Sequence, residues 1–276
     1  MFRYTKGIAV REVILWIITA CALFPFWILI VTALKPTDQL YTTSAAVPTA
    51  IDFSSFVSVL TDERNNVARA LVNSILITVI ALAGLLVFGS LCAYVIARST
   101  RAWTKVTFYL VLIAILLPTQ LGTLPLYIGA KSLGLTGTIW GVALVWIGML
   151  MPFAVFLYAG FFRSLSTEYE EAAAIDGATP AQTFFRVVLP IMGPATGTVA
   201  ILTGLIVWND FFTSLLFLSG SDAQTIPVTM YYFVGGSVTE WNKIFAIVII
   251  SMVPILVFYV FAQKQFMQGY SGGVKG

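Results

Sequence analysis

The chain has 276 residues, of which 59% are hydrophobic and only 10% are charged. That apolar share exceeds what a water-soluble fold of this length can bury, so the composition favours a membrane protein. The sequence has no histidine, the side chain most used as metal ligand or general base, which disfavours an enzyme. The net charge of +3, without dense basic clusters, argues against nucleic-acid binding.

Six apolar stretches of about 20 residues or more are each long enough to cross a bilayer as a helix. The first is longer than the core of a cleavable signal and is interpreted as a retained span. The third contains Pro118 and Pro125, so we expect it to kink or end early and continue as a re-entrant or interfacial piece. The predicted fold class is all-α, with six transmembrane helices at residues 13–34, 71–97, 106–130, 138–162, 194–218 and 244–263.

The lysines and arginines of the connecting segments predict the orientation, because positive residues are retained on the cytoplasmic side. With both termini in the cytoplasm, ten of them fall inside and five outside. Residues 1–12 and 264–276 are then cytoplasmic ends flanking a transmembrane domain at 13–263. The segment 35–70 becomes the largest external loop, and Phe53, Phe56 and Val57 would allow it to form a short helix on the membrane surface.

The connection at residues 163–193 is too patterned to be a simple turn. Acidic residues and alanines at 168–174 favour a helix whose first turn is negative, and Asp176-Gly177 offers a stop. A second helix is predicted to begin at Thr179-Pro180, with Gln182 completing a capping box, and to break at Pro190. The expected product is a helix-turn-helix on the cytoplasmic face.

This stretch, from Glu171 to Gly177 with Leu189-Pro190 after it, resembles the EAA loop of ABC importer permeases. In that family the loop is a coupling helix pair that fits a cleft on a cytoplasmic ATPase subunit. The resemblance implies that alanines keep the contact flat, that the glutamate meets the ATPase or braces the loop, and that the glycine makes the turn. The alternative is an interfacial hairpin without a partner. The coupling residues implied are Glu171, Ala172, Ala173, Asp176, Gly177, Ala178 and Pro190.

The resemblance extends along most of the chain and points to the carbohydrate branch of these permeases, similar to the smaller membrane subunit of the maltose importer. The external segment 35–73 matches only loosely. The fragments that carry the likeness are Asn73-Ser74, Ala93-Tyr94 with Arg98, Pro125-Leu126-Tyr127, Trp208-Asn209-Asp210, Thr225-Ile226-Pro227 and the glycine-rich ending.

The sequence contains no Gly-x-x-x-x-Gly-Lys-Ser/Thr phosphate loop, so ATP and Mg²⁺ are expected on a separate subunit, with no cofactor or metal on this chain. The resemblance implies two ATPase subunits, a second permease subunit, an extracytoplasmic solute-binding protein and a sugar or polyol substrate, in the cytoplasmic membrane of a bacterial cell. The tail with Gly273 and Lys275 either reaches the ATPase pair or is a disordered end.

Asp210 is the ionisable residue inside a predicted span, where a charge facing lipid would cost roughly 3 kcal/mol or more. It should therefore face a cavity, a partner or the outer interface. Together with Trp208, Asn209 and Gln120 it is a candidate for the translocation pathway or its gate, although packing between helices would suit the same residues.

Three other readings compete with a sugar permease. An ABC permease for a phosphate ester or amino acid would share the EAA loop but fit the other fragments less well. A secondary transporter needs several intramembrane carboxylates or broken helices in matched halves, and neither is visible in the sequence. A membrane enzyme would need clustered catalytic residues near one face of the bilayer.

Overall fold

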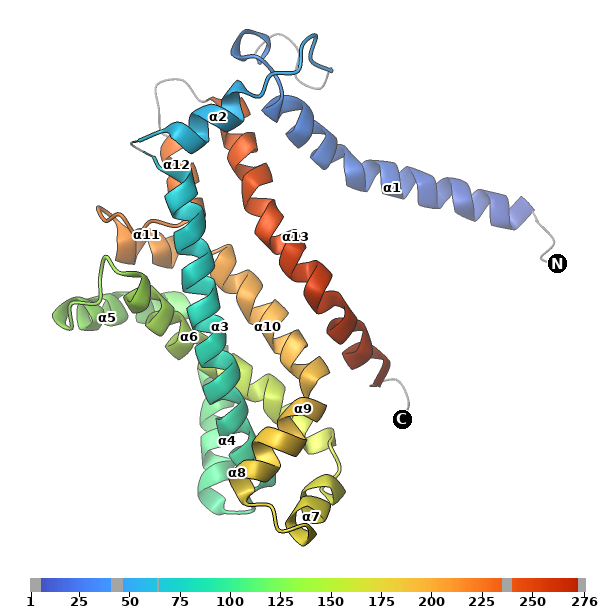
Figure 1. Ribbon diagram of the computed structural model, residues 1–276, viewed down its shortest axis with the longest axis vertical. Coiled ribbons are helices and arrows are strands. Elements are labelled where there is room, and N and C mark those ends of the chain that lie inside the picture. Colours follow the sequence, from blue (N-terminus) through green and yellow to red (C-terminus); the bar gives the residue numbers. More distant parts are fainter. Residues whose placement is uncertain (1–5, 41–46, 64, 235–239, 273–276) are drawn as a thin grey trace. The chain divides into compact units, whose positions relative to one another are not determined.

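The structure is a computed structural model that describes residues 6–40, 47–63, 65–234 and 240–272, and every element in those ranges is helical (Figure 1). The all-α fold predicted from the apolar stretches is confirmed. In chain order the elements are α1 (Lys6–Ala33), η1 (Thr37–Gln39), α2 (Ser54–Thr61), α3 (Val67–Arg98), α4 (Ala102–Leu116), α5 (Thr119–Ser132), α6 (Ile139–Ser164), α7 (Glu168–Ile175), α8 (Pro180–Gln182), η2 (Thr183–Val188), α9 (Leu189–Ile191), α10 (Gly193–Trp208), α11 (Phe212–Leu218), α12 (Ile226–Val234) and α13 (Trp241–Gly272).

Four of the described helices, α1, α3, α6 and α13, are long and apolar enough to cross a membrane unbroken, and the total rises to six if each of two sharply bent pairs forms one crossing. The four coincide with the first, second, fourth and sixth predicted spans. Their ends differ from the predicted bounds because apolar length sets a span, whereas helical hydrogen bonding continues into polar residues. α13, for example, continues to Gly272, nine residues beyond the predicted end.

The third predicted span is broken as expected. α4 and α5 are bent by 100° relative to one another. Leu117, which precedes Pro118, adopts an extended backbone with ψ of 130°, because the proline ring disfavours helical geometry in the residue before it. Pro125 lies inside α5 without ending it.

The fifth predicted span, 194–218, is wrong as a single helix, because α10 ends at Trp208 and α11 begins at Phe212. The 16 residues of α10 rise about 24 Å, less than the bilayer core of about 30 Å. The break arises where the Asp210 carboxylate accepts hydrogen bonds from the amides of Thr213 (3.1 Å) and Ser214 (2.7 Å) and so starts a new helix.

The chain divides into two compact units, and the first comprises residues 1–68 with 229–253. Within it, the Asn242 amide donates to the carbonyl of Lys35 (3.5 Å) and the hydroxyl of Thr37 (3.3 Å), so the start of α13 holds the segment after α1. The short helix expected in the external loop is present as α2, whose Val59 is fully buried. An 18-residue apolar window of α1 has no residue buried within the chain, which is consistent with a helix surrounded by lipid or by another subunit. Val31 and Ala33, at the end of the helix, are buried.

The second unit comprises residues 69–228 with 254–276, and α6 lies at its centre. α6 contacts α4, α5, α10 and α11, and its Tyr158 and Phe162 are fully buried. Small residues allow close approach of the neighbouring helices: a Cβ on Gly89 of α3 would lie 3.2 Å from Ala154 of α6. The most embedded helix of the unit therefore leads directly into the patterned connection that follows it.

Candidate coupling site

The connection between α6 and α10 folds as the predicted hairpin. α7 ends in a Schellman motif, in which the Ala178 amide donates to the Ala173 carbonyl (2.9 Å) and the Gly177 amide to that of Ala174 (3.1 Å). Gly177 has φ of +80°, a left-handed conformation that costs a residue with a Cβ about 1–2 kcal/mol. The turn assigned to this glycine from the sequence is present.

The second arm begins with the predicted capping box. The Gln182 amide donates to the Thr179 hydroxyl (3.4 Å), and the Thr179 amide donates to the Gln182 side chain (2.8 Å). The prediction that Pro190 breaks this arm is wrong, because α9 continues to Ile191 and the 74° bend into α10 lies at Met192. The turn before Pro190 is a π-helix, whose backbone hydrogen bonds do not follow the i→i+4 pattern of an α-helix. The proline therefore does not interrupt a regular α-helical hydrogen bond at this point.

A hollow of about 470 Å³ separates the two arms of the hairpin. Arg186 of the second arm lies in its wall, so acidic and basic side chains both border it. Glu171 and Pro190 are not among the residues that line it. The hollow brings together five of the seven residues implied by the resemblance, Ala172, Ala173, Asp176, Gly177 and Ala178.

The first arm presents uncovered apolar side chains beside this hollow. Ile175 is 87% exposed and Tyr169 is 49% exposed. Ala172 is exposed as well, whereas Ala173 is buried in the hairpin at 8% exposure. Glu171 is exposed and accepts a hydrogen bond from the Thr167 hydroxyl (3.0 Å). The outer face of the arm is therefore partly apolar, and Ala173 is not part of it.

An ion pair that the sequence did not reveal ties the first arm to α3. Arg98 Nε lies 2.7 Å from Glu170 Oε1, and Arg98 Nη2 donates to the Leu165 carbonyl (3.0 Å). The two charged residues are 72 positions apart, beyond the reach of helical spacing rules, so only the tertiary structure brings them together. Glu170, next to the predicted glutamate, is thus the carboxylate that braces the loop against a span.

An aromatic cluster ties the second arm to the spans. Phe184 of η2 is 3% exposed and lies 5.0 Å, ring centre to ring centre, from Tyr94 of α3 and 6.4 Å from Phe162 of α6. Tyr94 and Phe162 are themselves 5.5 Å apart in an edge-to-face arrangement, which aromatic pairs favour. The second arm therefore packs directly against two membrane helices.

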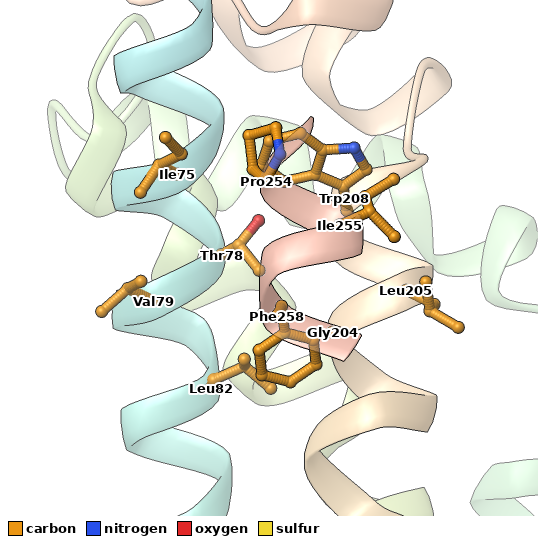
Figure 2. Close-up of a pocket in the computed structure, with 10 residues that line it drawn as sticks. All are labelled: Ile75, Thr78, Val79, Leu82, Gly204, Leu205, Trp208, Pro254, Ile255 and Phe258. Atoms are coloured by element: carbon orange, nitrogen blue, oxygen red, sulfur yellow. The ribbon is translucent and has the colours of Figure 1, made fainter. Parts of the chain in front are cut away.

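The residues proposed for the translocation pathway do not line one common cavity. Trp208 lines an apolar cavity of about 170 Å³ between α3, α10 and α13, where Thr78 and Leu82 point from α3 toward Phe258 (Figure 2). Asn209, Asp210 and Gln120 do not line this cavity.

These three residues have other local roles. The Asn209 side chain donates to the Leu205 carbonyl (2.8 Å), the Asp210 carboxylate caps α11, and Gln120 is exposed on α5. The geometry explains Asp210 first as a helix cap, whose negative charge suits the positive helix start. Gly273 and Lys275 lie outside the described residues.

Residues 85–271 match the family model described as binding-protein-dependent transport system inner membrane component. The chain belongs to this family. It is accordingly a multi-pass membrane protein and a transport subunit rather than an enzyme, and it works with a solute-binding protein and with an ATPase partner.

Curated relatives of this family cover nearly the whole chain. The melibiose/raffinose/stachyose import permease protein MelC of Bacillus subtilis (strain 168) is 34% identical over 94% of both chains. The trehalose transport system permease protein SugB of Mycobacterium tuberculosis (strain CDC 1551 / Oshkosh) is 30% identical over 94% of this chain and 95% of its own.

A solved structure supports the fold. A chain from the crystal structure of a bacterial ABC transporter involved in the import of the acidic polysaccharide alginate has a TM-score of 0.81. It matches 96% of this chain and all of its own length, at 23% identity. At that identity the likeness carries the helical architecture alone.

Proposed function

We propose that this permease carries a sugar or polyol into a bacterial cell across its cytoplasmic membrane. The observation that carries the substrate class is that relatives of 28–34% identity, over at least 94% of this chain, are named for melibiose, raffinose, stachyose, trehalose or diacetylchitobiose transport. They include MelC and SugB, which this chain matches over 94–95% of their length. A phosphate ester or amino acid is the competing substrate class.

Coupling to ATP hydrolysis would occur through the hairpin of residues 163–193. Its outer face offers Ile175 and Ala172 as exposed apolar groups, and the neighbouring hollow is bordered by Asp176 and Arg186. Such a surface suits docking into a cleft of another protein, with opposite charges fixing the register. ATP and Mg²⁺ would bind that partner, since this chain has no phosphate loop.

The complete importer would contain a second permease subunit beside this one and two ATPase subunits, with the solute-binding protein on the outer side. Alternating access would follow when closure of the ATPase pair pushes the hairpin and, through Phe184, the spans α3 and α6. Both termini would lie in the cytoplasm, as the distribution of positive residues favours. The tail beyond Gly272 would then be on the side of the ATPases.

A binding screen with the purified solute-binding protein tests the substrate class. We expect melibiose, raffinose or trehalose to bind it and to raise ATP hydrolysis by the complete importer in proteoliposomes. An amino acid or a phosphate ester that binds and stimulates hydrolysis, while the saccharides do neither, would contradict the proposal.

A further inference from the structure

Arg98 is the last residue of α3, and its guanidinium contacts two groups in the first part of the hairpin at residues 163–193. One nitrogen pairs with Glu170 in the first turn of α7, at 2.7 Å, and another donates to the Leu165 carbonyl at 3.0 Å, just after α6. The planar fork of an arginine can serve both acceptors at once, whereas a lysine ammonium is a single point charge. The end of α3 is thus joined both to the entry of the loop and to its first helix.

The environment makes this pair more costly to break than an ordinary surface ion pair. Both side chains are only 17% exposed, whereas the other two ion pairs found in the described ranges join side chains that are 27–93% exposed. An exposed pair is screened by water and contributes little, while removing one partner of a largely buried pair leaves the other charge uncompensated. Loss of either residue should therefore release the contact and not merely weaken it.

Tyr94 connects the ion pair to the second arm of the hairpin. It lies one helical turn before Arg98, on the same face of α3. Its ring packs against Phe184 at 5.0 Å. One turn of α3 therefore holds the first arm by charge and the second arm by aromatic packing.

We propose that Arg98 and Glu170 form a clamp that makes the hairpin and the end of α3 move as one piece, and so set how much uptake results from each ATP hydrolysed. The proposal rests on the coupling role assigned above to the hairpin. Both are positioning residues: Glu170 faces α3, whereas the exposed Glu171 remains available to a partner. The clamp transmits displacement to α3 in parallel with the aromatic route to α6.

The test uses the complete importer in proteoliposomes, with melibiose and trehalose as first probes, and measures uptake per ATP hydrolysed. We expect Arg98→Gln and Glu170→Gln to lower this ratio at least about threefold, with hydrolysis still stimulated by the loaded binding protein. Arg101→Gln is the matched control, because it removes an exposed positive charge three residues away, outside the clamp. An unchanged ratio in both single variants overturns the proposal.

A charge reversal separates the ion pair from a general effect on folding. The double variant Arg98→Glu with Glu170→Arg restores the pair, so its ratio should exceed that of either reversed single variant. A double variant as poor as the singles overturns the clamp. Arg98→Lys keeps the charge but lacks the planar fork that places Nε and Nη2 against Glu170 and Leu165 together, so it should assemble and lower the ratio less than Arg98→Gln. If the glutamine variants do not assemble, the lysine variant decides: a reduced ratio supports the clamp and an unchanged one overturns it.

Gly177→Val, measured in the same preparation, separates this inference from the proposed function. If it uncouples hydrolysis from uptake and the Arg98 variants do not, the clamp fails and the coupling role of the hairpin stands. If neither Gly177→Val nor the Arg98 variants change the ratio, the coupling role itself fails, and the clamp with it.

Discussion

Phe184, in the second arm of the hairpin, packs its ring 5.0 Å from that of Tyr94 at the end of α3. Phe184 is 3% exposed, while its neighbour Phe185 is 53% exposed, so two adjacent phenylalanines differ almost only in burial. Through this buried ring the second arm packs against the membrane helices α3 and α6. This contact turns a surface hairpin into part of the core of the second unit.

Phe184→Ala should weaken the packing of the second arm against α3 and α6. Replacing a buried phenylalanine with alanine typically lowers the free energy of unfolding by about 3–5 kcal/mol. We therefore expect a lower unfolding midpoint of the purified importer and less uptake per ATP hydrolysed. Phe185→Ala is the matched control and should change neither by much, because its ring is half exposed. Equal effects of the two substitutions would show that burial at position 184 is not what matters.

Gly177→Val tests the turn between the two arms. Valine must adopt the φ of +80° found at this position, at a cost of about 1–2 kcal/mol or more, and we expect uncoupled hydrolysis with normal membrane insertion. Gly160→Val, in a helical stretch of α6 where a Cβ meets nothing within 4 Å, provides the control. Normal transport by Gly177→Val at normal expression would contradict the role of the turn.

Asp210 variants distinguish a helix cap from a charge in the pathway. Asp210→Ala removes both acceptors at the start of α11 and should destabilise the chain by about 0.5–2 kcal/mol. Asp210→Asn keeps one good acceptor without the charge, so it should retain most of the stability and most of the transport. Melting curves and uptake of the two variants check this. An Asp210→Asn variant that is stable but no longer transports would instead show that the charge acts in the translocation pathway.

Asn73 forms a further buried contact at the start of α3. Its side-chain amide donates to the carbonyls of Asp222 and Gln224, at 3.0 Å each. We expect Asn73→Ala to lower stability by about 1–3 kcal/mol, because both carbonyls lose their donor. Arg69→Ala breaks the neighbouring ion pair with Asp222, whose side chains are 53% and 93% exposed, and should change stability by less than about 1 kcal/mol. Thermal unfolding of both variants gives the comparison, and a larger loss from Arg69→Ala would contradict this assignment.

The parts of the fold that depend on local chemistry were predictable from the sequence. Apolar length located the four unbroken spans, Gly177 marked the turn, and the Thr179 capping box marked the second arm, because each signal acts locally along the chain. The contact between Arg98 and Glu170 was not predictable, since nothing local relates residues 72 positions apart.

Two residues, Asp210 and Pro190, led to wrong predictions from the sequence. Asp210 was interpreted as a charge inside a continuous span, but an aspartate is equally a helix start, and here its carboxylate begins α11. Pro190 was expected to end a helix, but a π-helical turn precedes it and the bend falls at Met192. In both cases one residue type had two structural uses, and the choice depended on the surrounding tertiary structure.

Photo-crosslinking from the hairpin tests the central claim most directly. A photoreactive residue at position 175, where Ile175 is 87% exposed, should form an adduct with the ATPase subunit in the assembled importer. The same residue at position 110 of α4, where Leu110 is 59% exposed, should not. An assembled importer in which position 175 yields no ATPase adduct, or labels lipid alone, would contradict the coupling role of the hairpin.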